Sequence, residues 1–283
     1  MFESAPSGLA CPVKGCGKPL GPDRTRWVCP AGHGFDRARS GYTNLLQPGD
    51  RRSRAAGDRP EATRARARLL ARGVGLGHLV ALAERAVLAA RGAPRRPAHV
   101  LEVGCGVGAL RDRIALELAE DGWCAGLDLS ATAADRAAKL GGPGLFLVAN
   151  ADRRLPFLDG AIDVLVSVAG PKAPAEFARV LAPGGVLLLA VPGPGDLAEL
   201  REAVQGDGRE LPRGDRAAAV FAGPMELVGR QRLVERHALD RAVLGDLLLA
   251  SYRGGRRAEA ERAQALDELW VTLELDLLEF RRA

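Results

Sequence analysis

The sequence predicts an α/β fold, with a mixed sheet of about seven strands and a small zinc-binding module at the N-terminal end. Three observations predict it. From residue 98 onward, short apolar runs alternate with helical stretches, which is the pattern of a parallel sheet covered on both faces. Two later segments alternate between apolar and polar residues, as antiparallel edge strands do. Ahead of these lies a segment that concentrates cysteine, histidine and glycine.

The first element is a module over residues 1–40 with paired metal-binding residues. Four residues separate Cys11 from Cys16, and three separate Cys29 from His33. Thiolate and imidazole groups at such spacings are the ligands of tetrahedral structural zinc. A module of this size buries too little apolar surface to fold alone, so a metal is a suitable cross-link. We therefore predict a structural Zn²⁺ site at Cys11, Cys16, Cys29 and His33.

The second element, residues 41–97, is predicted to be a basic linker followed by helices. Residues 37–60 are polar and lack periodicity, which indicates a linker or exposed loop, whereas 61–72 and 77–91 have helical periodicity. Eight arginines occupy positions 51, 52, 54, 59, 64, 66, 68 and 72. Such a run favours a phosphate-rich partner. It also fits the solvated face of a helix in an arginine-rich chain, and the formal net charge of +5 leaves both interpretations open.

The third element, residues 98–283, carries the alternating pattern of strands and helices. The predicted strands are 99–103, 124–127, 145–148, 162–168 and 186–191, with two edge strands at 226–237 and 270–280. The predicted helices between them are 109–120, 131–139 and 173–181. Because the two late strands alternate in polarity, they are expected to pair antiparallel at one edge of an otherwise parallel sheet.

A glycine-rich loop follows the first of these strands, with glycine at every second position rather than in a dinucleotide-binding pattern. Glycine lets the backbone approach a cofactor without an intervening Cβ. Asp128 ends the next strand, where its carboxylate can accept hydrogen bonds from both ribose hydroxyls. Asp152 follows the third strand, beside the expected adenine edge. We predict that a nucleotide cofactor contacts Glu102, Gly104, Gly106, Gly108, Asp128 and Asp152.

Composition restricts the cellular setting. The sequence shows no secretory leader pattern, and no apolar stretch approaches the roughly 20 residues of a membrane span. Five cysteines are present, an odd number, and three of them belong to the predicted zinc set. A disulfide framework is therefore not favoured. We expect a soluble cytoplasmic protein with no membrane partner.

The glycine loop, the two aspartates and the turn Leu181-Ala182-Pro183-Gly184-Gly185 resemble the class I S-adenosylmethionine-dependent methyltransferases, which have a Rossmann-like fold. Four N-terminal segments point to one family within this superfamily. They are Cys29-Pro30 with His33, Phe35-Asp36, Gly41-Tyr42-x-Asn44-Leu45-Leu46, and Arg52-Ser53-Arg54-x-x-Gly57-Asp58. Together with Pro192-Gly193-Pro194-x-x-Leu197-x-Glu199-Leu200, they resemble the bacterial 23S rRNA (guanine-N1)-methyltransferases.

The resemblance implies methyl transfer from S-adenosylmethionine to N1 of one guanine in a hairpin of 23S rRNA. It also implies that the zinc module helps to recognise the RNA and that the protein works as a homodimer. The sequence departs from the family where Asp196 stands at a position that is often histidine, and where a family tyrosine is missing in the segment 73–76.

The sequence alone does not assign the catalytic residues. Asp196 and Glu199 are candidates for the proton acceptor, and Lys172, in the loop after the fourth strand, is a candidate contact to the guanine edge. The N-terminus of a surface helix would explain Asp196 equally well. His78 and the other histidines outside the zinc set fit ordinary structural or surface roles.

Two other functions fit parts of the pattern. A methyltransferase for a small molecule could carry the zinc module for stability alone, and tight salt-dependent RNA binding would exclude it. A non-catalytic RNA-binding relative could keep a decayed cofactor fold, and measurable cofactor binding would count against it.

Overall fold

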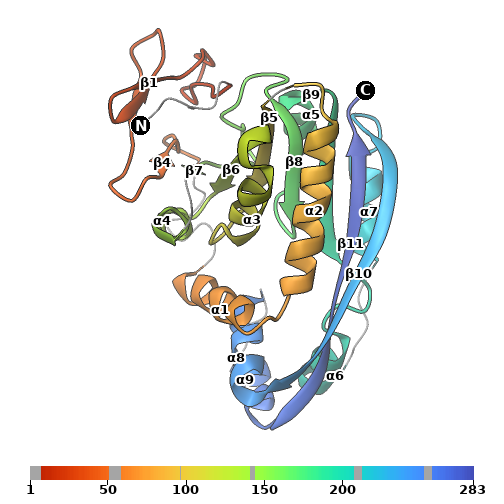
Figure 1. Ribbon diagram of the computed structural model, residues 1–283. Helices are drawn as coiled ribbons and strands as arrows, with labels where there is room; N and C mark the ends of the chain where they lie inside the picture. Colours follow the sequence, from red (N-terminus) through yellow and green to blue (C-terminus); the bar gives the residue numbers. More distant parts are fainter. Residues whose placement is uncertain (1–7, 51–58, 96, 141–143, 207–211, 252–256) are drawn as a thin grey trace.

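The computed structural model describes residues 8–50, 59–95, 97–140, 144–206, 212–251 and 257–283 (Figure 1). The N-terminal module holds a three-stranded antiparallel sheet made of β1 (Gly21–Asp23), β2 (Arg26–Val28) and β3 (Gly34–Asp36). The rest of the described chain is built around one eight-stranded sheet in the order β10-β11-β9-β8-β5-β6-β7-β4.

The large sheet contains the seven strands that the sequence predicts. These are β5 (Ala98–Val103), β6 (Gly122–Asp128), β7 (Leu145–Val148), β8 (Ile162–Val168), β9 (Leu181–Pro192), β10 (Glu226–Asp240) and β11 (Glu268–Arg281). β5 to β9 run parallel, and β11 pairs antiparallel with both β9 and β10, so the mixed sheet is confirmed. The turn expected before β9 lies inside the strand, where the pairing with β8 shifts register.

The eighth strand, β4 (Thr43–Asn44), corrects one expectation. It lies within residues 37–60, which the sequence indicates to be a linker or exposed loop, yet it pairs parallel with Leu147 and Val148 of β7. Thr43 is fully buried, and the following Leu45 belongs to the core. The pairing covers the edge of β7, which would otherwise present unpaired backbone groups.

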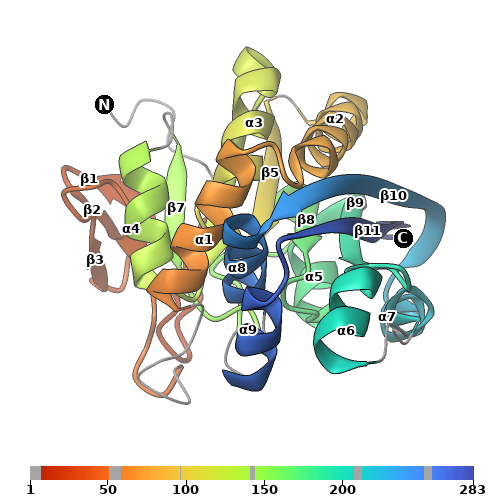
Figure 2. The same ribbon diagram turned by 90° about the horizontal axis from the view of Figure 1, so that it is seen from below.

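Helices cover both faces of the sheet, as Figure 2 shows. One face is covered by α2 (Leu76–Gly92) and α3 (Ala109–Leu118), and the other by α5 (Pro174–Val180) and α7 (Arg213–Phe221). α4 (Ala131–Leu140) packs on β6 and β7, and the short 3₁₀ helix η1 (Ala119–Asp121) follows α3.

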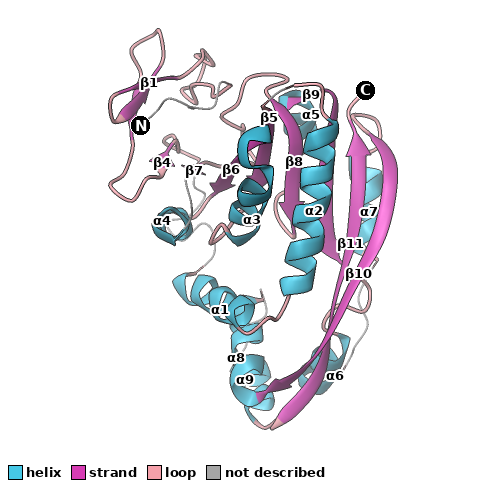
Figure 3. Ribbon diagram, in the orientation of Figure 1, coloured by secondary structure: helices cyan, strands magenta, loops and turns pink. Residues whose placement is uncertain are grey.

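A second core lies beside the sheet, where β10 and β11 extend past the other strands (Figure 3). Its helices are α1 (Pro60–Ala71), α6 (Ala198–Gln205), α8 (Arg241–Ala250) and α9 (Arg257–Gln264). Of these helices, the sequence predicts only α1. A cap could have revealed α8, since Asp240 Oδ1 accepts a hydrogen bond of 2.9 Å from the Val243 N–H.

The zinc module is not a separate body on a tether. Its Leu9, Cys11 and Trp27 lie in the same apolar core as Leu127 and Leu147 of the large sheet. Backbone hydrogen bonds tie it to the segment before β8, from Ala10 N to Pro156 O at 2.9 Å and from Leu158 N to Gly8 O at 2.8 Å. Folding of the module and packing of the sheet face are therefore coupled.

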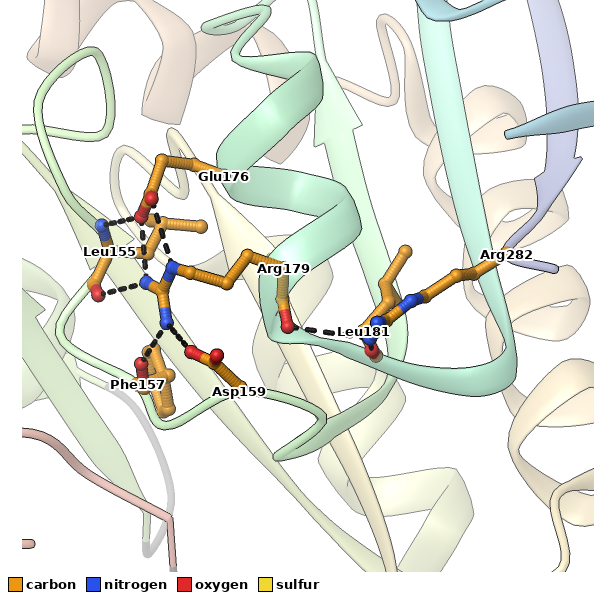
Figure 4. Close-up of polar contacts among 7 residues, drawn as sticks. All are labelled: Leu155, Phe157, Asp159, Glu176, Arg179, Leu181 and Arg282. Atoms are coloured by element: carbon orange, nitrogen blue, oxygen red, sulfur yellow. Dashed lines mark hydrogen bonds and ion pairs between the residues drawn. The ribbon is translucent and has the colours of Figure 1, made fainter. Parts of the chain in front are cut away.

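Arg179 of α5 holds the segment on which the module docks (Figure 4). Its guanidinium donates to the carbonyl oxygens of Leu155 at 2.9 Å and Phe157 at 2.8 Å, and to the Glu176 carboxylate at 2.7 Å. Asp159 accepts a further bond of 2.8 Å. Although burial opposes it, hydrogen bonding from Arg179 keeps the pKa of Glu176 below its usual value.

We expect Arg179→Ala to lower the free energy of unfolding by about 2–4 kcal/mol, because two carbonyls and a half-buried carboxylate lose their partner. Urea denaturation measures this loss. Arg113→Ala is the matched control, since Arg113 and its partner Glu117 form an i,i+4 surface pair worth about 0.5 kcal/mol. Equal losses in the two variants would contradict the role given to Arg179.

Candidate functional site

One cavity of about 820 Å³ opens at the carboxyl ends of the parallel strands. Of the residues predicted to contact a cofactor, Glu102, Gly104, Gly106, Asp128 and Asp152 line it. Ligands of open α/β sheets bind at this edge, so the location agrees with the sequence prediction.

The glycine loop turns sharply between β5 and α3. Gly104 N and Cys105 N both donate to Leu127 O, at 2.7 and 3.1 Å, which fixes the loop against β6. Gly108 has a φ of +80°, and a Cβ there would lie 2.8 Å from the ring of Phe146. Gly108 does not line the cavity. Because it lacks a Cβ, Gly108 allows the first turn of α3 to lie close to β7.

Asp128 is fixed with its carboxylate at the cavity wall. Its Oδ2 accepts from Gly106 N at 2.9 Å, and its Oδ1 accepts from Ser130 N at 2.8 Å. Each carboxylate oxygen has a further lone pair. A pair of neighbouring hydroxyls is therefore a suitable ligand for a carboxylate held in this way, as expected for a ribose.

Glu102 is buried at the base of the cavity. Burial raises the pKa of its carboxyl to about 8, with smaller upward contributions from Asp128 and Asp112. Among the described residues, its Oε2 has no hydrogen-bond partner. A buried, unsatisfied acceptor is costly in the free protein and fits a cationic donor such as an ammonium group.

The raised pKa predicts an unusual dependence of stability on pH. Between pH 4.5 and about pH 8 the unfolded chain has lost the Glu102 proton while the folded chain keeps it. Stability is therefore lost as pH rises through this window. We expect Glu102→Gln to be more stable than the wild type by about 2–5 kcal/mol at pH 8, with the difference vanishing near pH 4.5. Thermal unfolding across this range, without ligand, measures it, and a difference independent of pH would contradict it.

Asp152 also lines the cavity and is exposed. Its backbone N–H donates to Asn150 Oδ1 at 2.9 Å, and Asn150 Nδ2 donates to Asp50 O at 2.6 Å. The turn after β7 is thus tied to the segment that follows β4. Binding of a ligand at this turn would therefore depend on the position of the N-terminal part of the chain.

The three catalytic candidates differ in their position relative to the cavity. Asp196 lines the cavity, whereas Glu199 and Lys172 do not. Both oxygens of Glu199 accept hydrogen bonds from Thr272, at 2.6 and 3.0 Å, and despite burial these bonds lower the pKa of Glu199. Lys172 is exposed, and desolvation together with Arg213 and Arg216 lowers its pKa.

Asp196 is not a helix cap. α6 begins after Leu197, and no side chain caps its first turn. The Asp196 Oδ1 instead accepts from Glu274 N, at 3.1 Å, in β11. Asp196 thus stands one residue before the N-cap of α6, but its side chain is bonded to β11 and not to the first turn of the helix.

Several lining residues are not predicted from the sequence, among them His78, Arg66, Arg201 and Arg213. His78, which fits an ordinary structural role by sequence, is buried, and its Nε2 has no hydrogen-bond partner in the described part of the chain. Burial lowers the pKa of this imidazole against the opposing effect of Glu235. Gly75, from the segment that lacks the family tyrosine, also lines the cavity. No local sequence pattern predicts that these residues line the cavity, because helices distant in sequence bring them to it.

The N-terminal module gathers the four predicted metal ligands. One donor atom from each of Cys11, Cys16, Cys29 and His33 lies within 4.8 Å of the others. The Cys16 and Cys29 sulfurs are 3.8 Å apart, and His33 Nδ1 is 3.4 Å from the Cys11 sulfur and 3.5 Å from that of Cys29. Zinc bonds of about 2.3 Å to sulfur and 2.0–2.1 Å to nitrogen give tetrahedral edges of this size. The donor set fits a closed, structural Zn²⁺ site.

Comparison with protein families gives two matches. Residues 9–54 match a zinc-ribbon model described as RlmA, N-terminal. Residues 101–189 match a model described as a methyltransferase domain. The first match spans the metal-binding module and β4, and the second spans the glycine loop and the strands that carry it.

Two curated proteins are similar over most of the chain. The 23S rRNA (guanine(748)-N(1))-methyltransferase of Streptomyces fradiae is 35% identical over 263 residues, covering 92% of this chain and 90% of that protein. A protein of Micromonospora griseorubida, with a provisional name for the same guanine-N1 activity, is 38% identical over 216 residues, or 68% of each chain.

Among solved structures, the plantazolicin methyltransferase BpumL, in complex with a desmethylPZN analogue and SAH, is 12% identical. The match covers 79% of this chain and 92% of that one, with a TM-score of 0.49. Among the described residues, no single helix is long and apolar enough to cross a membrane, and only α1 and α2, bent by 89°, reach that threshold when taken together.

Proposed function

This chain belongs to the 23S rRNA (guanine-N1)-methyltransferase family, and from that membership we propose that it methylates N1 of one guanine in 23S rRNA. The observation that carries the proposal is a single cavity in which Asp128 and the glycine loop lie together with Asp196 and three arginines. Bound S-adenosylmethionine supplies an electrophilic methyl group, so no metal is required at the reacting atoms.

The cofactor is held by the residues at the strand ends. We propose that Asp128 accepts hydrogen bonds from the ribose hydroxyls and that Glu102 faces the methionine ammonium. Gly104 and Gly106 give the backbone access, and Asp152 lies beside the adenine. Gly108 acts indirectly, through its packing against Phe146.

We propose Asp196 as the proton acceptor. Guanine N1 carries a proton at neutral pH and becomes nucleophilic only as that proton leaves. In the reaction the N1 proton passes to the Asp196 carboxylate and a bond forms between N1 and the methyl carbon. The bond between that carbon and sulfur breaks, and its electron pair leaves with S-adenosylhomocysteine.

Asp196→Asn is expected to slow single-turnover methyl transfer by about 100-fold, within the range typical of general-base removal. Cofactor affinity should change little, because Asp128 and the glycine loop are untouched. Isothermal titration and rapid quench separate the two effects. A wild-type rate would eliminate Asp196 as the acceptor without affecting the assigned reaction.

The cationic side chains at the cavity suit a nucleotide that is flipped out of its stack. A guanine reaches an enclosed site only when it is unstacked from its neighbours. Arg66 and Arg213 line the cavity, and Lys172 and Arg216 lie near Arg213. These cations would hold phosphates on either side of the flipped base. Positions 51, 52 and 54 of the arginine run lie outside the described residues.

We propose three parts of the chain: a zinc module over 1–40, a basic segment over 41–97 and a methyltransferase domain over 98–283. The zinc module contributes to RNA recognition.

We also propose a homodimer in the cytoplasm. Exposed Leu227, Val228 and Val234 on the edge strand β10 support self-association. The five unpaired cysteines suit a reducing compartment.

Transfer of label from tritiated S-adenosylmethionine to unmethylated 23S rRNA tests the proposal. We expect incorporation into RNA that falls steeply with added salt, because phosphate contacts release counterions. Cofactor binding without label in RNA would favour the small-molecule methyltransferase instead. Absence of cofactor binding would favour the non-catalytic relative.

A further inference from the structure

The segment that carries Asp196 is held from β11 by a ladder of hydrogen bonds. Gly193 N donates to Glu274 O at 2.8 Å, and Leu197 N donates to Thr272 O at 2.8 Å. The Asp196 side chain joins the ladder through Glu274 N. The pairing between β9 and β11 therefore continues past the end of β9 into the segment 193–197, which enters the cavity wall.

The Glu274 side chain also contacts this segment. It is buried, its Oε1 accepts from Gly195 N at 3.3 Å, and Arg232 pairs with the same oxygen at 3.3 Å. A Cβ at Gly195 would lie 2.5 Å from the Glu274 Oε2, and a Cβ at Gly193 would also collide with this carboxylate. Only glycines allow the segment to lie this close to Glu274.

Arg201 of α6 contacts the same segment. It is buried and lines the cavity, and its guanidinium donates to Asp196 O and, at 3.3 Å, to Pro194 O. Leu197, the last residue of this segment, adopts a φ of +54°, a left-handed conformation that is strained for leucine. Such strain persists only where surrounding contacts enforce it, and it concentrates at functional sites.

We propose that Glu274 is a positioning residue for methyl transfer. Together with Arg201, it fixes the segment 193–197 so that the Asp196 carboxylate faces the N1 position of the target guanine. This inference rests on the proposed role of Asp196. Glu274 itself does not line the cavity, so it acts on the reaction through the segment and not through the substrate.

A double-mutant cycle tests the proposal in the full chain. Glu274→Ala is expected to slow single-turnover transfer by about tenfold or more, because a small misplacement of a reacting group is costly. Affinities for S-adenosylmethionine and for the RNA substrate should stay within about twofold. Glu274→Gln should lose less, since its amide oxygen can still accept from Gly195 N. The double variant Asp196→Asn, Glu274→Ala should be no slower than Asp196→Asn alone.

Glu279→Ala is the matched control, because Glu279 lies on the same strand and is similarly paired, with Arg85 at 2.9 Å, but stands opposite Leu188 of β9, away from the segment 193–197. The proposal is overturned if Glu274→Ala is no slower than this control, or if its effect multiplies fully with that of Asp196→Asn. Should Glu274→Ala fail to fold, Glu274→Gln enters the same cycle. A wild-type rate for Asp196→Asn overturns this inference together with the proton-acceptor role, while labelled RNA from the wild type keeps the methyltransferase function standing.

Discussion

Asp128→Ala is expected to weaken S-adenosylmethionine binding by about 100-fold or more, the largest effect on ligand affinity that we predict. Two hydrogen bonds from hydroxyls to a charged acceptor are lost, each worth about 1.5–3 kcal/mol. The substitution also removes the acceptor of Gly106 N and Ser130 N, so the glycine loop loses one of its contacts with β6. Isothermal titration of the purified protein measures the change in affinity.

Asp152→Ala provides the comparison for Asp128. Asp152 lines the same cavity, but it is exposed, so its substitution should cost only a few-fold in affinity. Circular dichroism should show both variants folded. Similar affinities for Asp128→Ala and the wild type would mean that the cofactor does not occupy this edge of the sheet.

Loss of the zinc is expected to destabilise the whole described fold, not the N-terminal module alone. Cys29→Ser removes one of four ligands, and structural zinc supplies much of the folding free energy of such modules. Leu9, Trp27 and Cys29 belong to the core that covers one face of the large sheet. We expect the melting temperature to fall by about 10 °C or more, measured by calorimetry alongside the zinc content.

His33→Cys is the informative partner of Cys29→Ser. It keeps four zinc ligands, so zinc content and melting temperature should stay close to those of the wild type. The contact between Asn150 and Asp50 adds a second readout, because zinc loss should also weaken cofactor binding at the turn that holds Asp152. A zinc-free protein with an unchanged melting transition would show that the module and the sheet are independent.

The sequence is most informative where signals are local. The apolar runs at 145–148 and 162–168 match β7 and β8 residue for residue, because buried parallel strands need continuous apolar segments. The metal ligands are equally predictable, since each pair has a local spacing typical of zinc sites, and the structure gathers Cys11, Cys16, Cys29 and His33. The predicted role of Asp128 in cofactor binding likewise depends only on its place at the end of a strand.

The remaining features depend on contacts between distant segments. Two residues, Thr43 and Asn44, form a strand only because the edge of β7 is there to receive them. Glu274 is charged and lies in an alternating strand, which predicts an exposed side chain, yet Gly193 and Gly195 leave a space that it fills. Neither effect has a local sequence signature, and His78 reaches the cavity in the same way, through the packing of α2.

Identification of the methylated nucleoside tests the central claim most directly. Unmethylated 23S rRNA is incubated with the protein and S-adenosylmethionine, digested to nucleosides and analysed by mass spectrometry, with primer extension on the intact RNA. We predict 1-methylguanosine and one strong stop at a single guanine, since a methyl group at N1 blocks Watson–Crick pairing. A different methylated nucleoside, or cofactor turnover with unmodified RNA, would contradict the account.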